Sequence, residues 1–580
     1  MNRIKPYISA IILLALLFTA CENHDDSPSP GGNAGEFAEN FGNEVSRDFF
    51  GQIVDINDNP IQNVTVRIGS ATAQTDENGV FMINNAPVHE RFAYITASKI
   101  GFIDGSRSII PTTGKNNIKI MMIPSSSTMV SSGQPSEITL DNGTKVVFDG
   151  AFENEDGSSY SGDVLVSAFY LSARDENLQD LMPGMLYAQD QNGEEAMLVT
   201  YGMMHVELRA PSGAKLQIAE GHSAELTMRI ANEQLASAPS TIPLWYFDEE
   251  LGYWKEEGFA TKQGNFYVGD VTHFSWWNCD APFPTVTLTT TIFDSEGNPV
   301  TNAQIGLLTT LSPYERVGFS NSNGQISGLV PSNQVMTMNV YDNCGNLISA
   351  SQIGPFAADT VLPAINLSSA VNAVLVEGTL LSCSNTNVTN GYVQLNYEGE
   401  SFFTTVSDGH FSFSTLACSS ATAFSLTGAD YDNLQVTDLI NYTYSAPVTN
   451  VGNIVACSNV MQFISYQIDS DPPAVCLIEL GGTLGSTTQP GLAVFGYFEG
   501  QGDIYIYSNI TAPGTYTTAN FAIEGNGIGY IGPSTPNDII FIVSNIGAVG
   551  EYIDMTFNGT YNDDGVTRTI TGTAHVVRNQ

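Results

Sequence analysis

Short stretches of alternating apolar and polar residues, separated by turns, run through most of the chain. F-F-G-Q-I-V-D-I-N-D-N-P-I-Q-N-V-T-V-R-I-G alternates on either side of D-N-P, and A-Q-T-D-E-N-G-V-F-M-I follows with a second tight turn. A period of two is typical of strands with one buried face, and turns of this kind join hairpins. Only N-E-Q-L-A-S has the pattern of a short helix. We therefore expect an all-β protein.

The strand–turn–strand pattern recurs at two later places in the chain. In the second copy S-N-S-N-G takes the place of T-D-E-N-G, and a fainter third copy begins with V-E-G-T-L-L-S-C and continues at S-D-G-H-F-S-F. A repeated unit of this length predicts three related β-sandwiches. The matching residues of the first two copies are Asp55, Asn59, Pro60, Ile61, Asn63 and Val64, and Asp294, Asn298, Pro299, Val300, Asn302 and Ala303.

The N-terminus has the pattern of a signal peptide. A charged M-N-R-I-K-P-Y precedes an apolar run that is too short to span a bilayer as a mature helix. The run ends in L-F-T-A-C, which resembles the lipobox of bacterial lipoproteins. This resemblance implies cleavage after Ala20 and lipidation of Cys21, so that the lipid holds the protein to a membrane. An ordinary secretory signal with a chance cysteine is the alternative.

A polar segment, E-N-H-D-D-S-P-S-P-G-G-N-A-G, follows the cysteine. Its Pro, Gly and Ser content predicts a flexible tether. The acidic residues Glu22, Asp25 and Asp26 resemble the export signal of lipoproteins of the Bacteroidota, which implies an outer-membrane location facing the cell exterior. A plain solvated linker is the alternative.

The first copy of the repeat resembles the carboxypeptidase-like regulatory domain, a transthyretin-like sandwich of about seven strands found in surface proteins of the Bacteroidota. The resemblance weakens over residues 285–367 and is marginal over 372–457. It implies a string of Ig/transthyretin-like sandwiches and no hydrolysis, because this module is not catalytic in its namesake enzymes. The residues that carry the match are Gly51, Asp55, Pro60, Val64, Thr75, Asp76, Gly79 and Phe81.

The remaining segments are also rich in strand patterns. One contains all four tryptophans and resembles the domain that follows the regulatory-like module in many Bacteroidota lipoproteins, through L-W-Y-F-D and V-T-H-F-S-W-W-N. The last ends in a hairpin pattern around D-D-G. The expected organisation is a signal peptide (1–20), a disordered tether (21–45), a regulatory-like sandwich (46–124), a β-rich domain with a Trp cluster (129–280), a second sandwich (285–367), a third, degenerate sandwich (372–457) and a C-terminal β-rich domain (461–580).

Charge and cysteine content restrict the partners and the compartment. A net charge of -41 opposes binding to nucleic acid. Once Cys21 is lipidated an even number of cysteines remains, which fits an oxidising compartment. Six cysteines allow 15 connectivities, and we guess that neighbours pair, Cys279 with Cys344 and Cys383 with Cys418. The candidate disulfide cysteines are Cys279, Cys344, Cys383, Cys418, Cys457 and Cys476.

The stretch V-T-H-F-S-W-W-N-C-D, residues 271–280, collects residue types that serve in active sites. Successive strand residues point to opposite faces, so Trp276 and Trp277 cannot share one side of a sheet. Core packing or an interdomain contact is the favoured interpretation, because an aromatic side chain of this size is commonly buried. The alternative is that one of the two rings is partly exposed and stacks on a sugar. His273 has no second metal ligand nearby in sequence. Cys279 is a candidate for a disulfide bond to the next domain.

Motifs that carry catalysis are absent from the sequence. There is no HExxH, G-x-S-x-G, Walker loop or CxxC pair, so we predict no catalytic residue, metal site or cofactor. The acidic groups at 248–250 and at 469 and 471 could flank a glycosidic bond, with exposed turn acids as the alternative. Asp55, Asn57 and Asn59 are spaced like the start of an EF-hand loop, but Pro60 stands where that loop needs glycine, which predicts a turn. Structural calcium binding by Asp-rich sandwich loops is an alternative that the sequence leaves open.

The combined prediction is a non-enzymatic, lipid-anchored outer-membrane surface protein that acts as a structural, adhesive or assembly module. The alternative is a glycan- or peptide-binding lipoprotein for nutrient capture, and an enzyme is a third hypothesis. A glycan or another surface protein is the expected partner.

Overall fold

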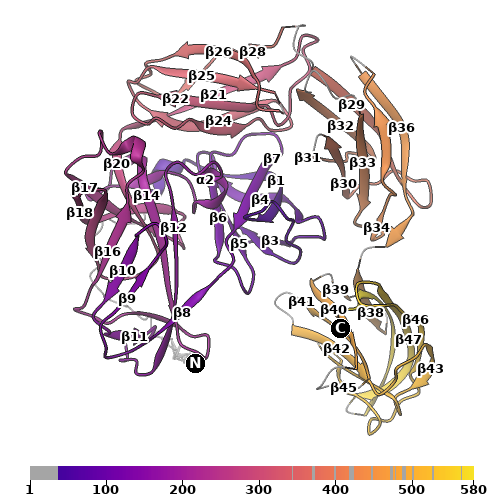
Figure 1. The fold of residues 1–580 in the computed structure, drawn as a ribbon. Coiled ribbons are helices and arrows are strands. Elements are labelled where there is room, and N and C mark those ends of the chain that lie inside the picture. Colours follow the sequence, from indigo (N-terminus) through magenta and orange to yellow (C-terminus); the bar gives the residue numbers. More distant parts are fainter. Residues whose placement is uncertain are drawn as a thin grey trace, which may run out of the picture.

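The computed structural model shows a protein built almost entirely of strands (Figure 1). Strands make up 61% and helices 2%, so the predicted all-β fold is confirmed. None of the helices in the described residues is long and apolar enough to cross a membrane. Ala20, Cys21 and Cys418 lie outside the described residues. The structure describes residues 37–579 apart from 343, 369–372, 398–399, 417–422, 446–447, 461, 470–473, 477, 486–490, 499–501, 526–527 and 564.

The first sandwich is formed by β1 (Glu44–Asp55), β2 (Thr65–Ile68), β3 (Ala71–Gln74), β4 (Val80–His89), β5 (Ala93–Ser98), β6 (Gly105–Ile109) and β7 (Asn116–Met122). Its two sheets have the strand orders β4-β1-β7 and β3-β2-β5-β6. Inward side chains of both sheets, such as Phe49, Ile53 and Ile95, form one core. This is the result that alternating apolar positions predict.

Folded structure begins earlier than the sequence predicts. The expected tether reaches residue 45, but a short 3-10 helix, η1 (Ala38–Phe41), precedes β1. Phe37 and Phe41 are buried with Phe92, Tyr187 and Tyr253. The burial of these two large aromatic side chains is the physical reason why the tether ends sooner.

A single large sheet, the tryptophan unit, follows. Its strands are β8 (Ser127–Ser131), β9 (Ser136–Thr139), β10 (Lys145–Phe148), β11 (Phe152–Asn154), β12 (Asp163–Leu171), β13 (Tyr187–Gln189), β14 (Glu195–Arg209), β15 (Lys215–Ile218), β16 (Ala224–Arg229), β17 (Thr241–Asp248), β18 (Tyr253–Gln263), β19 (Phe266–Val271) and β20 (Trp276–Phe283). They make a 13-stranded sheet in which β20 lies between β14 and β17. The helices are α2 (Leu178–Leu181) and η2 (Asn232–Gln234), and η2 falls on the predicted N-E-Q-L-A-S segment.

The second and third sandwiches share the topology of the first. The second has β21 (Thr285–Phe293), β22 (Gln304–Thr309), β23 (Arg316–Phe319), β24 (Gln325–Pro331), β25 (Met336–Tyr341), β26 (Leu347–Ile353), β27 (Thr360–Val361) and β28 (Ile365–Asn366). The third has β29 (Ala373–Ser382), β30 (Gly391–Tyr397), β31 (Glu400–Thr405), β32 (His410–Leu416), β33 (Ala423–Asp430), β34 (Gln435–Val436), β35 (Ile440–Thr443), β36 (Val448–Ala456) and β37 (Asn459–Val460). In each copy the first strand lies between an antiparallel partner and a parallel one, as in β4-β1-β7, β24-β21-β27 and β32-β29-β36.

The repeated D-x-x-x-N motif is a turn closed by its own side chain. Asp55 Oδ1 accepts hydrogen bonds from the backbone N–H groups of Asn57 at 2.8 Å and Asn59 at 3.0 Å. Asp294 Oδ1 accepts one from the N–H of Asn298 at 2.7 Å. The carboxylate oxygen therefore serves the backbone, which explains the EF-hand-like spacing at Asp55 without a cation.

The C-terminal sandwich completes the chain. It has β38 (Phe463–Ile468), β39 (Ala474–Cys476), β40 (Ile478–Leu484), β41 (Leu492–Phe498), β42 (Gly502–Ser508), β43 (Gly514–Thr517), β44 (Phe521–Gly525), β45 (Gly529–Ile531), β46 (Ile540–Ile546), β47 (Tyr552–Asp563) and β48 (Val566–Val577). The sheets have the orders β39-β38-β48-β47-β46-β43 and β40-β41-β42-β44-β45. Asp563 pairs with Val566 at the β47–β48 turn, which confirms the predicted C-terminal hairpin.

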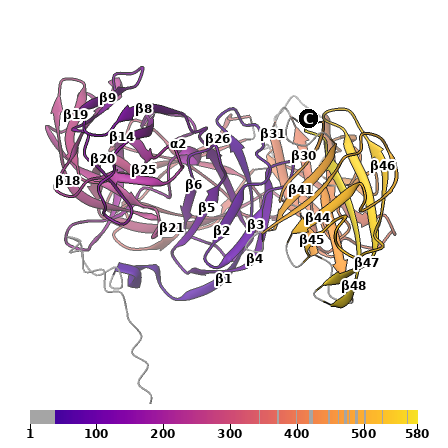
Figure 2. The same cartoon turned by 90° about the horizontal axis from the view of Figure 1, so that it is seen from below.

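The first sandwich occupies a central place among its neighbours. Figure 1 shows the tryptophan unit on one side of it, the second sandwich above it and the third sandwich on the other side. The C-terminal sandwich follows the third. The view from below in Figure 2 keeps the first sandwich between the tryptophan unit and the third and C-terminal sandwiches.

Candidate functional site

Trp276 and Trp277, the predicted stacking residues, are both buried. Their side chains are 3% and 0% exposed, and they enter two different cores on opposite faces of β20. The alternation prediction and core packing, the favoured interpretation, are confirmed, and the alternative that one ring faces outward and stacks on a sugar is wrong. β20 has a hydrogen-bonded strand on each side and a core on each face, so neither ring reaches solvent.

The neighbouring residues of this stretch have structural roles. The indole N–H of Trp277 donates to the His273 carbonyl at 3.0 Å, and the His273 ring packs edge-on against Tyr246 at 4.7 Å. Trp245 and Trp254 share the core of Trp276. They are not direct cross-strand partners, because Trp254 lies opposite Phe247. The stretch is the central strand of a sheet with two covered faces.

The cysteines pair differently from our guess. Cys383 bonds to Cys457, because Ser382 and Ala456 are register partners on the parallel strands β29 and β36 and each cysteine follows directly. The Cα atoms of the bonded pair are 4.6 Å apart. Nearness in sequence was the wrong criterion, since parallel strands bring together residues 74 positions apart.

The other described cysteines show that the predicted disulfide between Cys279 and the next domain is also wrong. Cys344 is disulfide-bonded, but not to Cys279, which is a free buried thiol in a core of the tryptophan unit. Burial raises the pKa of the Cys279 thiol, and the charge of Asp280 raises it further. Cys476 is a buried thiol in the core of the C-terminal sandwich.

The acidic groups that could suit glycoside hydrolysis lie in turns. Asp248 accepts hydrogen bonds from backbone N–H groups of its own turn and pairs with Lys255 at 2.8 Å. Asp469 accepts from the N–H of Thr569 and pairs with Arg568 at 3.0 Å. Within the described residues, no three His, Cys, Asp or Glu side chains are grouped to hold a metal ion.

The half-buried carboxyl group of Asp76 joins the first and third sandwiches. Asp76 Oδ2 accepts the phenol O–H groups of Tyr392 at 2.7 Å and Tyr431 at 3.1 Å, while its Oδ1 accepts the N–H groups of Asn78 and Val80 in its own turn. Burial raises the pKa of Asp76, although these hydrogen bonds oppose the shift. The sequence repeat marks Asp76 as a turn residue but gives no sign of its partners.

Two charged groups influence each other across the boundary between the tryptophan unit and the second sandwich. Asp280 is fully buried in the middle of β20 and accepts a hydrogen bond from the Asn278 amide at 2.6 Å. Burial raises its pKa well above the usual range, and the charge of Arg316 on β23 opposes this. Burial also lowers the pKa of Arg316, whose Nη2 is buried without a hydrogen-bond partner among the described residues.

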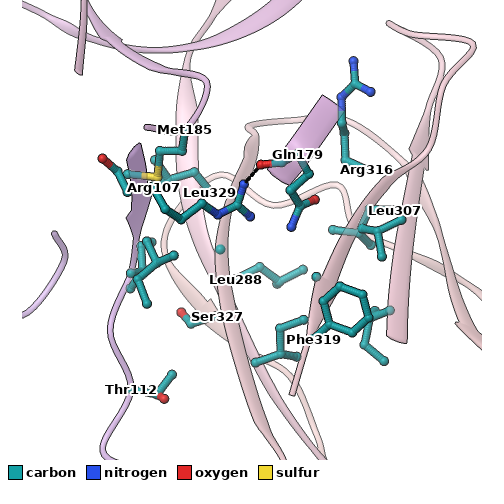
Figure 3. A pocket seen from close by; sticks show the side chains of 18 of the residues that line it. Arg107, Thr112, Gln179, Met185, Leu288, Leu307, Arg316, Phe319, Ser327 and Leu329 are labelled. Carbon is teal, nitrogen blue, oxygen red and sulfur yellow. Dashed lines mark hydrogen bonds between the residues drawn. The ribbon is translucent and has the colours of Figure 1, made fainter. Parts of the chain in front are cut away.

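An apolar cavity of about 300 Å³ lies between the first sandwich, α2 and the second sandwich (Figure 3). Leu288, Leu307, Phe319 and Leu329 line it. The Arg107 guanidinium group donates to the Gln179 carbonyl oxygen at its edge. The cavity has the size and lining of a small-ligand site. Sequence reasoning missed it because its walls come from three separated segments.

A larger cleft of about 1100 Å³ lies where the three repeated sandwiches meet. Its walls carry amide and hydroxyl groups, including those of Asn117, Asn323, Thr405 and Asn450. Such groups can donate hydrogen bonds to a polar ligand and accept them from it. The cleft is therefore chemically distinct from the apolar cavity.

Comparisons with known proteins find only partial likeness. No family model matches the chain. A stretch of 126 residues, 21% of this chain, is 35% identical to human cartilage intermediate layer protein 2, and 125 residues are 33% identical to the mouse protein. The chain spans about 10% of the length of these curated relatives.

Solved structures with some likeness are a streptococcal ancillary pilin and BcpA, the major pilin subunit of Bacillus cereus. The first is 12% identical, with 40% of this chain and 99% of that chain covered and a TM-score of 0.13. The second is 8% identical, with coverages of 72% and 100% and a TM-score of 0.12. A putative membrane-associated protein of Bacteroides fragilis is 8% identical, with coverages of 42% and 99% and a TM-score of 0.12. TM-scores this low do not establish a common overall structure.

Proposed function

We propose that this chain is a non-enzymatic, lipid-anchored protein of the outer-membrane surface that serves as a structural or adhesive module. The observation that carries the proposal is the central position of the first sandwich, which is fastened to three other units by specific side-chain contacts. Domains joined only by flexible linkers would lack such contacts. We call the first sandwich and the three units that contact it the bracket. A rigid arrangement of this kind suits a protein that holds a binding partner at a set distance from a membrane.

Polar contacts on three sides of the first sandwich support this bracket. Ser108 Oγ donates to the Gly252 carbonyl of the tryptophan unit at 2.8 Å. Asn117 Nδ2 donates to Asn302 Oδ1 of the second sandwich at 2.7 Å. The Tyr392 phenol of the third sandwich donates to Asp76. Hydrogen bonds of this kind add about 1 kcal/mol each and fix one relative orientation.

Apolar contacts seal two of the same interfaces. The buried aromatic group around Phe37 and Phe92 joins the first sandwich to Tyr187 and Tyr253 of the tryptophan unit. Phe50 and Val80 share a buried cluster with Tyr392 and Ala429 of the third sandwich. Apolar burial gives each interface most of its stability, since the polar contacts mainly set direction.

The anchor part of the proposal rests on the sequence before Phe37. Three features of this segment are typical of a lipoprotein. They are the expected signal peptide, the L-F-T-A-C motif and the acidic segment after Cys21. Cells that express the chain should incorporate an alkyne analogue of palmitate, and Cys21→Ser should remove the label. Protease added to intact cells should degrade the body. Persistent label in Cys21→Ser would contradict the anchor, and protection of the body from protease would contradict the outward orientation.

Nutrient capture is a second candidate function, and the polar cleft between the three repeats favours it. Amide and hydroxyl groups such as those of Asn323 and Asn450 suit the hydroxyl groups of a glycan. Trp276 and Trp277 no longer support this function, because both are buried. Calorimetric titration with a polysaccharide panel should show binding that Asn450→Ala weakens and Phe259→Ala, a control on the exposed surface of the tryptophan unit, leaves unchanged. Failure of the whole panel to bind would leave the structural role as the function.

A further inference from the structure

We propose that the outer face of the sheet β40-β41-β42-β44-β45 in the C-terminal sandwich binds arginine- or lysine-bearing segments of a partner protein. The proposal deepens the adhesive role and names its partner chemistry. The site is a row of four side chains, Phe495, Tyr505, Glu524 and Tyr530, one from each of four adjacent strands. We call it the aromatic–acidic row.

Strand register places the row directly across the sheet. Phe495 on β41 lies opposite Tyr505 on β42, Tyr505 lies opposite Glu524 on β44, and Glu524 lies opposite Tyr530 on β45. Neighbouring strands are about 4.8 Å apart. The carboxylate therefore stands between two tyrosines whose backbones are about 10 Å apart.

The row faces solvent while its strand neighbours face the core. Tyr505 and Tyr530 are 40% and 49% exposed, whereas Ile504, Ile506 and Ile531 are fully buried. Tyr505 and Tyr530 flank Glu524 on this face, and the stacked Phe495 ring extends the aromatic surface beyond Tyr505. Contiguous exposed apolar surface of this kind commonly marks an interaction site.

The rings of the row are held in place by their surroundings. The Phe495 and Tyr505 rings are stacked, with centroids 5.5 Å apart and planes 18° from parallel. The Tyr530 ring lies over Gly532, where an added Cβ would stand 2.3 Å from the phenol oxygen. Ordered rings bind a partner at a lower entropic cost than mobile ones.

Charge identifies the occupant as cationic. Residues 461–580 contain eleven acidic residues and two arginines, and no lysine. Both arginines are engaged elsewhere, Arg568 with Asp469 at 3.0 Å and Arg578 with the Gly547 carbonyl at 2.9 Å. Among the described residues, no cationic side chain forms an ion pair with Glu524. An anionic ligand would be repelled from this sandwich.

The chemistry of the row matches a guanidinium or ammonium group. A cation is attracted to the faces of tyrosine rings and to a carboxylate, and one side chain placed between Tyr505 and Tyr530 uses both. Arginine suits the site better than lysine, because its planar group stacks on a ring while its N–H groups donate to a carboxylate. A neutral sugar could use the rings but would not exploit the charge of Glu524.

The test uses the purified full chain and a fluorescent peptide of six Arg-Gly repeats, at about 0.15 M salt. Peptides with lysine or with citrulline, the neutral isostere of arginine, are compared by fluorescence polarisation. We expect the arginine peptide to bind at least tenfold more tightly than the citrulline peptide. Tyr505→Ala and Tyr530→Ala should each weaken arginine-peptide binding about threefold to fivefold, and Tyr505→Phe, which keeps the ring, should not.

Matched controls separate the row from the general acidity of the chain. Glu524→Gln should weaken binding about threefold, whereas Glu176→Gln, at an exposed position of the tryptophan unit, should not change it. Phe259→Ala removes a ring that is 56% exposed elsewhere and should also be neutral. Equal effects of site and control variants would overturn the proposal in favour of nonspecific attraction. Absence of arginine-peptide binding would overturn it outright.

A glycan is the competing occupant, and the same variants identify it. Binding of cellohexaose that is lost in Tyr505→Ala, without binding of the arginine peptide, would overturn the proposal and assign the row to sugars. The anchor experiment on Cys21 is independent of these results. Peptide binding with no lipid label would therefore contradict the proposed location alone, and a lipid label with no peptide binding would contradict this proposal alone.

Discussion

The carboxyl group of Asp76 accepts a hydrogen bond at 2.7 Å from the phenol of Tyr392, which lies 316 residues further along the chain. The bond crosses from the first sandwich to the third, where the Tyr392 side chain is buried and Asp76 is half-buried. Asp76 thus closes its own hairpin through one oxygen and fixes a neighbouring sandwich through the other.

Removing the phenol group of Tyr392 should weaken the interface between the first and third sandwiches. We expect Tyr392→Phe to cost about 1–3 kcal/mol, because it leaves a carboxyl oxygen at the interface with one hydrogen bond fewer. Hydrogen exchange of β30 and the β3–β4 hairpin, followed by mass spectrometry, should rise at the interface and not within the tryptophan unit. Tyr505→Phe is the matched control, since the Tyr505 ring is exposed. Unchanged exchange at the interface would contradict the role of Tyr392.

Residues close in sequence explain what could be predicted of this fold. The side-chain-closed turn at Asp55 depends on a neighbour four positions away, so the motif is visible in the sequence. The Asp76–Tyr392 bond depends on the packing of two separate sandwiches against each other, and the Cys383–Cys457 bond depends on the pairing of distant strands. No local sequence pattern contains either relationship. The pairing of Ser382 with Ala456 had to be seen before the disulfide could be assigned.

The tryptophans also show that local sequence does not contain the contacts made by distant segments. Alternation was enough to place Trp276 and Trp277 on opposite faces of one strand. Whether a face is covered depends on the size of the sheet and on the layers above it, and these are supplied by β14, β17 and other distant segments. The aromatic–acidic row was missed for the converse reason, because its four residues are separated by turns and meet only through register.

Both tryptophans should therefore behave as core residues. We expect Trp276→Ala and Trp277→Ala each to destabilise the tryptophan unit by about 3–5 kcal/mol, the usual cost of deleting a large buried aromatic side chain. Urea unfolding monitored by the fluorescence of the remaining tryptophans measures this directly, since all four lie in this unit. Phe259→Ala should shift the midpoint little. A variant of either tryptophan with wild-type stability would contradict its burial.

The disulfide of the third sandwich should stabilise that sandwich selectively. Cys383 and Cys457 close a loop of 74 residues, so Cys457→Ser should cost about 2–4 kcal/mol by freeing the unfolded chain. Limited proteolysis should then cut first between β29 and β36, and peptide mapping of the wild type without reduction should recover the linked pair. Recovery of a Cys383–Cys418 peptide instead would contradict the assignment.

The buried Asp280 should make the stability of the tryptophan unit depend on pH. Burial raises its pKa in the folded state well above the value of about 3.9 expected on unfolding. The folded state therefore holds the proton more tightly, and the stability associated with this group is greatest below the unfolded pKa and is lost as the pH rises through the folded one. Asp280→Asn, which keeps the shape and stays neutral, should remove this dependence.

The free energy of unfolding from tryptophan fluorescence in urea should thus fall between pH 4 and neutrality in the wild type relative to the variant. Glu176→Gln, at an exposed position, should follow the wild-type profile. A wild-type profile parallel to that of Asp280→Asn would mean that Arg316 compensates the buried charge fully, and would contradict the prediction.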